Sequence, residues 1–316
     1  MEKSAYREVD GYYLSWVFAE TNVRSALNYV PQPGDVFIVS YPKCGNTWLE
    51  HIVYNIFNDR APPGSWSDHF QEMPFLELQG AEAARDMRRP GSIKTHMPFQ
   101  LQPYSRDAKY ICICRNPYDC CVSFFHHTRN RPVYRFSDGT FDEFFEMFLA
   151  GKVDFGDYFT HLLSWYEHRD DPNVLFLTYE DLKEDTATWA MKIADFLGED
   201  YGKKLRTDER ALENVLKRTS FEVMKKHVNE LNRNLIPDRV LMPDEKIPEW
   251  VKSSSRSLGQ WEPDKNREAR DIVRKGVIGD WTTHFSAEQV KRLKEHIELK
   301  TRGSDVMNLW QKLQLP

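Results

Sequence analysis

The stretch Asp35-Val-Phe-Ile-Val-Ser-Tyr-Pro-Lys-Cys-Gly-Asn-Thr-Trp48 decides the fold of this chain of 316 residues. Its apolar first half predicts a buried strand over 35–41, which Pro42 ends. Beyond it, apolar residues recur at helical spacing, at Trp48, Leu49, Ile52, Val53, Ile56 and Phe57. The stretch therefore predicts a strand, a short loop at 42–47 and a helix that follows at once.

Three further strands are predicted outward from this unit, at 92–96, 109–114 and 174–179. The last is a continuous apolar run, which is typical of a strand covered on both faces. Helices are predicted from Pro117 to about 130, near 141–150, near 156–169, through Trp189 and Ile193 to Gly198, and near 286–299. Strands that alternate with helices indicate the α/β class, with a central, mostly parallel sheet flanked by helices.

The chain is predicted to form a single domain over 1–316, because no internal repeat or low-complexity tract divides it. The stretch 228–264 differs from the rest. It is rich in Asn, Pro, Ser and charged residues, and it has no clean period. A loop this long in a compact protein is usually a functional lid or disordered, so we expect a lid or loop region at about 228–264.

The composition is that of a globular protein, with 41% hydrophobic and 13% aromatic residues. The formal net charge is only -5, which argues against a general nucleic-acid surface, so any anion site must be local. No apolar run predicts a signal peptide or a membrane span. Five cysteines without a C-x-x-C pair favour a reducing compartment. We expect a cytoplasmic protein without a metal, a nucleic-acid partner or a membrane partner.

The loop at 42–48 is the first candidate anion site. A strand that runs directly into a helix points the free N–H groups of the helix at one spot, where phosphate or sulfate binds. Gly45 lets the backbone approach the anion, Lys43 adds a charge and Thr47 adds a hydroxyl. The loop is not a Walker A motif, because its lysine precedes its glycine. The alternative is an ordinary strand-to-helix turn with a surface lysine.

Two further clusters suit an anion. Arg115 ends a strand, and Ser123 follows about two helical turns later, so both can face one phosphate. Arg274-Lys-Gly276 places two cations next to a glycine, as in a small anion nest. The alternatives are a surface pair of Arg115 with Asp119 and an ordinary basic helix end.

A fourth cluster, Lys94-Thr-His96, lies at the carboxyl end of a predicted strand, the edge where open α/β sheets bind ligands. Lys94 and His96 alternate along the strand, so both side chains lie on one face. Histidine titrates near neutral pH and serves as a general base in many enzymes. The alternative is a structural histidine.

The order of these clusters resembles the cytosolic sulfotransferase family. Tyr41-Pro-Lys-Cys-Gly-Asn-Thr-Trp48 is similar to its 5′-phosphosulfate loop, and Arg115-Asn-Pro-Tyr-Asp-Cys-Cys-Val-Ser123 to its 3′-phosphate segment. Arg274-Lys-Gly-Val-Ile-Gly-Asp-Trp281 is similar to its C-terminal nucleotide loop. Lys94-Thr-His96 and Val174-Leu-Phe-Leu-Thr-Tyr-Glu-Asp181 also match, and order and spacing agree from about residue 33 to 285.

The resemblance implies a P-loop-like α/β fold and a sulfuryl donor, 3′-phosphoadenosine 5′-phosphosulfate (PAPS), with 3′-phosphoadenosine 5′-phosphate (PAP) as product. It implies that the 5′ end is held by Lys43, Cys44, Gly45, Asn46, Thr47 and Trp48. The residues implied at the 3′-phosphate are Arg115, Ser123, Arg274, Lys275 and Gly276. Those implied around the adenosine are Tyr179, Thr219 and Phe221, with Trp48 and Phe221 stacking on the base. His96 is implied as catalytic base, with Lys43 and Lys94 beside the transferring group.

On the acceptor side, the positions that resemble the family's pocket wall are Phe18, Phe75, Lys94, His96, Phe124, Phe125 and His127. Ordinary core aromatics are the alternative for each ring. An aromatic box suits a flat phenol or aryl amine. The expected acceptor is therefore the hydroxyl or amine of a small aromatic molecule, such as a phenol or catecholamine.

The chain departs from the family pattern at a few positions. Cys44 stands where serine is usual and Asn46 where threonine is usual, but the backbone N–H groups survive both changes. Ile272 stands where an aromatic residue is common. The segment through which many relatives dimerise is poorly matched at 282–291, so we expect a monomer or a dimer that does not use this segment.

Three other functions compete with this interpretation. A nucleotide kinase needs a Walker-type loop, which is missing. A phosphatase that uses Cys44 commonly has an arginine six residues after the cysteine, where this chain has Glu50. A non-catalytic nucleotide-binding module has no need of Lys43, Lys94 and His96 together.

Overall fold

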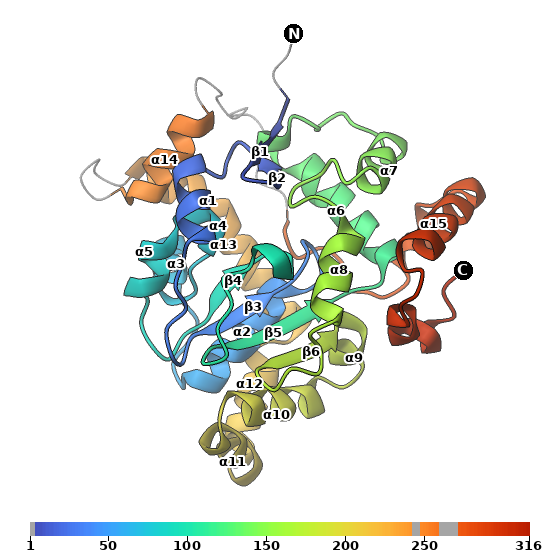
Figure 1. The fold of residues 1–316 in the computed structure, drawn as a ribbon. Helices are drawn as coiled ribbons and strands as arrows, with labels where there is room; N and C mark the ends of the chain where they lie inside the picture. Colours follow the sequence, from blue (N-terminus) through green and yellow to red (C-terminus); the bar gives the residue numbers. More distant parts are fainter. Residues whose placement is uncertain (1–3, 242–246, 259–270) are drawn as a thin grey trace.

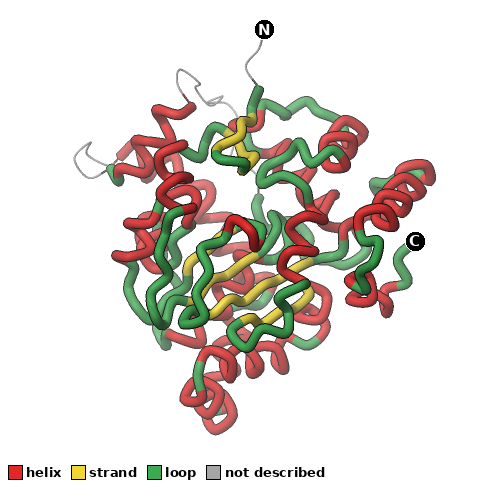
Figure 2. The backbone as a smooth tube through the Cα atoms, in the orientation of Figure 1, coloured by secondary structure: helices red, strands yellow, loops and turns green. Residues whose placement is uncertain are grey.

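The computed structural model describes residues 4–241, 247–258 and 271–316. Within them, a four-stranded sheet lies between layers of helices (Figures 1 and 2). Its strands are parallel, in the order β4-β3-β5-β6. They are β3 (Val36–Val39), β4 (Ile93–Thr95), β5 (Lys109–Cys114) and β6 (Val174–Thr178). The predicted α/β class with a parallel sheet is confirmed. An antiparallel hairpin of β1 (Tyr6–Val9) and β2 (Tyr12–Ser15) lies apart from this sheet.

The helices predicted from sequence periodicity are all present within the described residues. They are α2 (Asn46–Phe57), α6 (Pro117–Asn130), α7 (Phe141–Leu149), α8 (Tyr158–Tyr166), α10 (Thr186–Leu197) and α15 (Ala287–Lys300). The helices without a prediction are α1 (Glu20–Leu27), α3 (Trp66–Glu72), α4 (Leu76–Gln79), α5 (Ala81–Asp86), α9 (Tyr179–Glu184), α11 (Glu199–Thr207), α12 (Glu209–Arg218), α13 (Phe221–Leu241) and α14 (Glu249–Leu258). Short 3₁₀ helices are η1 (Phe99–Leu101), η2 (Pro132–Tyr134), η4 (Asp280–Thr283) and η5 (Val306–Leu313).

The sheet is buried on both faces, which explains its continuous apolar strands. Side chains of successive strand residues point to opposite faces. On β3, Phe37 and Val39 pack into a core with α1, α4 and α5. Val36 and Ile38 pack into a second core with α2, α10 and α12 on the other face. A third core joins the end of β3 to α6, α7, α8 and α15. The two faces of one strand therefore pack against parts of the chain that are distant in the sequence.

The prediction of a loop at 228–264 is wrong for most of the residues that the structure describes there, because α13 extends to Leu241 and α14 covers Glu249–Leu258. Residues 242–246 and 259–264 lie outside the described residues. Both helices contact other helices, α13 with α3 and α12, and α14 with α1 and α4. Trp250 of α14 also meets Phe70 of α3 with ring centroids 4.9 Å apart. A surface helix carries polar and charged residues on its outer face, so the polar composition that favoured a loop is compatible with both helices. The lid function and the single domain stay predictions.

The strand order opens a crevice at the carboxyl edge of the sheet. In the sheet, β3 lies between β4 and β5, so the connections that leave these strands diverge at this edge. In open α/β sheets this divergence creates the crevice in which ligands bind. The segments that follow β3, β4 and β5 carry three of the four predicted clusters. Every helix of the described ranges is too short or too polar to cross a membrane.

Candidate active site

A cavity of about 690 Å³ lies at the carboxyl edge of the sheet, a volume suited to a small-molecule ligand. All four predicted clusters contribute to its wall, with Lys43, Lys94, Arg115 and Lys275 among the lining residues. Segments that are more than 200 residues apart in the sequence therefore meet at one site.

Most of the predicted site residues line this cavity. On the donor side they are Lys43, Gly45, Asn46, Thr47, Trp48, Arg115, Ser123, Tyr179, Thr219, Phe221, Arg274, Lys275 and Gly276. On the acceptor side they are Phe18, Phe75, Lys94, His96, Phe124 and His127. Ile272 also lines it. Cys44 and Phe125 are not part of the lining.

Phe125 is the one acceptor-side prediction that the structure contradicts. Successive residues on a helix point about 100° apart, so Phe124 and Phe125 cannot face the same side of α6. Phe124 reaches the cavity, whereas Phe125 packs on Phe141 with ring centroids 5.4 Å apart. Phe125 is therefore a core residue between α6 and α7.

The loop between β3 and α2 has the geometry of an anion cradle. Gly45 caps the helix with φ at 104°, and Lys43 also has a positive φ of 71°. The side chain of Asn46 donates to Ser40 Oγ over 3.0 Å and so ties the start of the helix to the end of β3. The first N–H groups of α2 have no partner within the helix, as in any helix N-terminus. They are available to an anion in the cavity.

Replacing Gly45 by alanine should lower the free energy of unfolding by about 1–3 kcal/mol, because a left-handed backbone strains any residue with a Cβ. The added Cβ would also lie 2.8 Å from Cδ2 of Tyr179. Urea denaturation measures the effect. Gly64→Ala is the matched control, since nothing lies within 4 Å of its added Cβ. Equal loss of stability in both variants would contradict the assigned strain.

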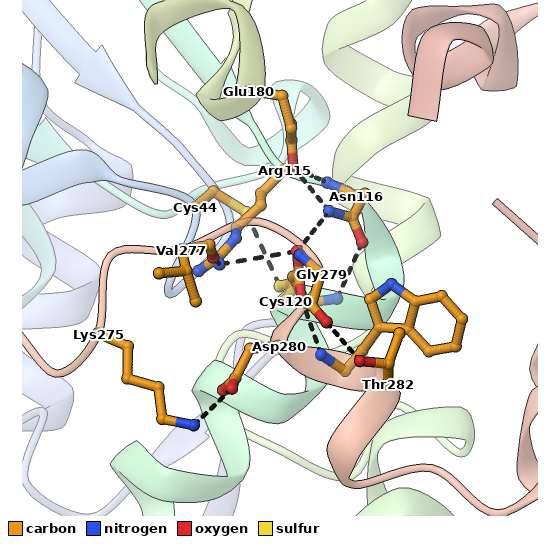
Figure 3. A network of polar contacts seen from close by, with 12 residues as sticks. Cys44, Arg115, Asn116, Cys120, Glu180, Lys275, Val277, Gly279, Asp280 and Thr282 are labelled. Carbon is orange, nitrogen blue, oxygen red and sulfur yellow. Dashed lines mark hydrogen bonds and ion pairs between the residues drawn. The ribbon is translucent and has the colours of Figure 1, made fainter. Parts of the chain in front are cut away.

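The side chain of Cys44 points away from the cavity. It is fully buried, and its sulfur lies 3.8 Å from Cys120 Sγ (Figure 3). The same sulfur lies 3.8 Å from the carbonyl oxygen of Pro42. Cys44 can therefore serve an anion only through its backbone.

Arg115 faces the cavity from the end of β5. Its Nη2 donates to the carbonyl oxygen of Val277 over 2.9 Å (Figure 3). Its guanidinium lies 4.5 Å from the ring centre of Tyr179. Within the described residues, its buried Nε has no hydrogen-bond partner. Arg115 and Asp119 lie 3.9 Å apart, but both are buried, so the alternative of a surface ion pair is wrong. An arginine with an unused buried donor is suited to a bound anion.

Asp119 links the C-terminal loop to α6. Its carboxylate accepts from the backbone N–H groups of Gly279 over 2.8 Å and Trp281 over 3.1 Å. This contact brings Arg274 and Lys275 to the cavity, although they lie more than 150 residues after Arg115. The segment 272–279 is not helical, so the alternative of a basic helix end is also wrong.

Arg274 and Lys275 share one acidic partner. Both cations pair with Asp280, and the distance from Lys275 Nζ to its Oδ1 is 2.6 Å (Figure 3). Burial alone raises the pKa of Asp280, but the two cations lower it to about 2. Asp280 therefore stays ionised and holds both side chains in the cavity wall.

Four aromatic and polar residues form a separate part of the cavity wall. Trp48 Nε1 donates to the carbonyl oxygen of Thr219 over 2.9 Å, and its ring meets that of Tyr179 at 5.7 Å between centroids. Phe221 lies against Gly276, where an added Cβ would come within 2.6 Å of the ring. These flat rings suit a nucleobase.

His96 is held in one orientation at the centre of the cavity wall. Its Nδ1 lies 2.6 Å from the carbonyl oxygen of Ser40. A carbonyl only accepts, so Nδ1 carries the hydrogen and Nε2 keeps its lone pair. Burial, and then the charge of Lys94, lower the pKa of His96 well below its ordinary value. The imidazole is therefore neutral at neutral pH, the form that a general base requires.

Glu77 holds the backbone of His96 in place, although no motif in the sequence marks this glutamate. Its Oε1 accepts from the His96 N–H over 2.6 Å, from Thr95 Oγ1 over 3.1 Å and from the hydroxyl of Tyr12 over 3.2 Å. Burial raises the pKa of Glu77 to about 7. Its position inside the apolar run Phe75-Leu-Glu-Leu78 could have marked it in the sequence as a buried polar residue.

The two lysines beside His96 have different surroundings. Burial, and then the charges of Arg131, Lys94 and Arg115, lower the pKa of Lys43 to about 7, although its side chain is partly open to the cavity. Lys94 Nζ lies 3.4 Å from Glu50 Oε2 and 5.2 Å from the ring centre of Phe75. Among the residues that the structure describes, no carboxylate pairs with Lys43, whereas Lys94 pairs with Glu50.

Several other lining residues were not anticipated. They include Val17, His51, His69, Phe70, Arg131, Tyr134, Asp154, Phe155 and Met224. No motif marks them, because they come from turns and helix faces whose direction depends on long-range packing.

Comparisons with known proteins agree with this site. A family model described as Sulfotransferase domain matches residues 33–311. Sulfotransferase 1E1 of Cavia porcellus is 31% identical over 286 residues, which are 86% of this chain and 85% of the relative. Sulfotransferase 1C2 of Oryctolagus cuniculus is 30% identical over 315 residues, covering 96% and 95%. Mouse sulfotransferase SULT7A1, solved in complex with PAP, is similar with a TM-score of 0.72 at 29% identity, covering 98% of this chain and 99% of that one. The chain therefore belongs to the sulfotransferase family.

Proposed function

We propose that this protein transfers the sulfuryl group of PAPS to a hydroxyl or amine of a small aromatic acceptor. The observation that supports this most directly is the shared cavity, in which an anion cradle, two further cationic clusters and a neutral histidine meet. The PAP complex of mouse SULT7A1 supports the choice of donor. Incubation with labelled PAPS and a panel of phenols, catecholamines, steroids and alcohols tests it, and no labelled product from any of them would argue against it.

The donor spans the cationic half of the cavity. The N–H groups at the start of α2, with Lys43 and Thr47, hold the 5′-phosphosulfate. Arg115, Ser123 and the segment 274–276 hold the 3′-phosphate, and the rings of Trp48 and Phe221 enclose the base. The donor's negative charge then offsets cations that otherwise repel one another.

The transfer is an in-line substitution at sulfur. A lone pair of the acceptor oxygen or nitrogen forms the new bond to sulfur, and the bond from sulfur to the bridging phosphate oxygen breaks. His96 Nε2 takes the acceptor proton, and Lys43 stabilises the charge that develops on the leaving oxygen. Lys94 neutralises the sulfuryl oxygens. As in phosphoryl transfer, most of the rate enhancement comes from positioning and charge stabilisation.

The acceptor half is aromatic next to His96. The imidazole meets the ring of Phe155 at 4.8 Å and that of Phe75 at 5.2 Å between centroids. Flat rings favour a flat acceptor, which supports a phenol-like substrate. Val228 and Leu231 of α13 also line the cavity, which supports a covering role for the start of the stretch 228–264.

Replacing Arg115 by alanine should weaken the binding of PAP by about 10- to 100-fold, because hydrogen bonds to a charged group contribute about 1.5–3 kcal/mol. Binding of adenosine 5′-phosphate, which lacks the 3′-phosphate, should change by less than about three-fold. Isothermal titration calorimetry with both nucleotides measures the difference. Arg169→Ala is the control, because Arg169 stacks on Tyr166 outside the cavity. Equal weakening of both nucleotides would remove Arg115 from the 3′-phosphate site.

The compartment and the assembly also belong to this proposal. All five cysteines are free and buried, which supports a reducing, cytoplasmic environment. The assembly stays as predicted, a monomer or a dimer that does not use the segment 282–291.

A further inference from the structure

Lys94 lies among the titratable groups of the cavity. Burial, and with it the charge of Lys94, lowers the pKa of five neighbours. They are Lys43, His51, His69, His96 and His127. Lys43 repels the ammonium of Lys94, and histidines that are neutral cannot offset this repulsion. A carboxylate must therefore stabilise a positive charge at this position.

Glu50 is the carboxylate that pairs with this cation. It lies on α2, about one turn after Thr47, and its Oε2 is 3.4 Å from Lys94 Nζ. Glu50 is fully buried and does not line the cavity, whereas Lys94 does. The ion pair therefore runs through the wall of the cavity, with the carboxylate behind the wall and the ammonium in it.

The contacts of Glu50 differ from those of a glutamate that stabilises the fold. Glu180, for comparison, accepts from the backbone N–H of Asn116 over 3.0 Å and from Trp310 Nε1 over 2.8 Å. Among the residues that the structure describes, Lys94 is the hydrogen-bond partner of Glu50, and the buried Oε1 has none. A buried ion pair adds little net stability, because both ions lose their hydration. The pair is therefore better explained by the site than by the stability of the fold.

The ammonium of Lys94 retains donors for a ligand. It has three N–H groups, and Glu50 accepts from one of them. The ring of Phe75 also meets the ammonium, with Nζ 5.2 Å from the ring centre. The carboxylate and the ring restrict the position of Nζ, while its remaining N–H groups can reach an anionic group in the cavity. A charge that is held in place before the reaction needs no rearrangement as the transition state forms.

We infer that Glu50 is a positioning residue for sulfuryl transfer, because it holds the ammonium of Lys94 at the place of the sulfuryl oxygens. The inference rests on the proposed function. Glu50 contacts neither nucleotide nor acceptor in this arrangement and acts through Lys94 alone. Its effect should therefore depend on the sulfuryl group, which PAPS carries and PAP lacks, and on pH, because Lys94 has to be protonated.

Isothermal titration calorimetry with PAPS and PAP, in the absence of any acceptor, tests the inference. Glu50→Gln keeps an oxygen that accepts from Lys94 but removes the charge. Without this charge, burial and repulsion from Lys43 favour loss of the Lys94 proton as the pH rises. At pH 9 the variant should bind PAPS about 10- to 100-fold more weakly than the wild-type protein, the usual range for a hydrogen-bonded charge. The loss should be smaller at pH 7, and the affinity for PAP should stay within about three-fold of wild type at both pH values.

Asp35→Asn is the matched control, since Asp35 is also fully buried and pairs with a cation, Arg89, outside the cavity. It should leave the ratio of the PAPS and PAP affinities unchanged at both pH values. A ratio that is also unchanged in Glu50→Gln overturns the inference, because a merely structural role would weaken both nucleotides equally. Wild-type protein that binds neither nucleotide contradicts the proposed function instead.

Thermal unfolding shows whether Glu50→Gln folds. If it does not, the double variant Glu50→Met with Lys94→Met replaces it, because it leaves no unpaired charge in the cavity wall. This variant should also bind PAPS about 10- to 100-fold more weakly and PAP normally, but its loss should be the same at pH 7 and pH 9. Wild-type affinity for PAPS in the double variant overturns the inference.

Discussion

Replacing His96 by alanine should lower kcat by about 10²–10⁴-fold, the usual contribution of a general base, while PAP still binds. The wild-type imidazole is neutral and oriented, because burial and Lys94 lower its pKa and Nδ1 donates to the Ser40 carbonyl. The methyl group of alanine has no lone pair that could take the acceptor proton. Single-turnover kinetics with preloaded PAPS separate this loss from any change in donor affinity.

Two further variants test whether the basic nitrogen of His96 causes the expected loss of kcat. Asn in its place keeps a hydrogen-bond donor for the Ser40 carbonyl but has no basic nitrogen, so it should be as inactive as the alanine variant. His168→Ala is the control, because His168 stacks on Phe99 outside the cavity, and it should retain wild-type kcat. Near-normal turnover of His96→Asn would show that positioning, and not basicity, is the contribution of this residue.

Replacing Lys43 by methionine should lower kcat by about 10²–10³-fold, the usual effect of removing one group that stabilises developing charge.

The same variant should also change the number of protons that the protein takes up when the nucleotide binds. Burial and neighbouring cations lower the pKa of Lys43 to about 7 without a nucleotide. Bound phosphate favours the ammonium form and raises this pKa again. Above pH 7, binding of PAP therefore takes up a proton, and the affinity falls as the pH rises.

Calorimetry at pH 8 in buffers with different ionisation enthalpies measures this uptake. Wild-type protein should take up a substantial fraction of one proton, and Lys43→Met much less. Lys204→Met is the control, because Lys204 is half-buried, pairs with Asp59 and does not line the cavity. A proton uptake that survives in Lys43→Met would place the titrating group elsewhere.

Short-range features of the sequence were sufficient to predict the central part of the site. The apolar run of β3, the glycine at the start of α2 and Pro117 at the start of α6 each specify a backbone conformation within a few residues. Because parallel strands end at one edge, Lys43, Lys94 and Arg115 had to meet there. The sequence by itself therefore determined the α/β sheet, the anion cradle and the position of His96 at its edge.

Tertiary structure decided what depends on the direction of side chains and on distant partners. Asp119 draws the segment around Gly279 to α6 across 160 residues, and no local period announces that contact. The rotation of α6 puts Phe124 in the cavity and Phe125 in the core. The lowered pKa of Lys43 arises only from burial and from the neighbouring cations that the surrounding fold brings close. Burial is a property of the whole packed molecule, so the electrostatics of the acceptor site could not be predicted from the sequence alone.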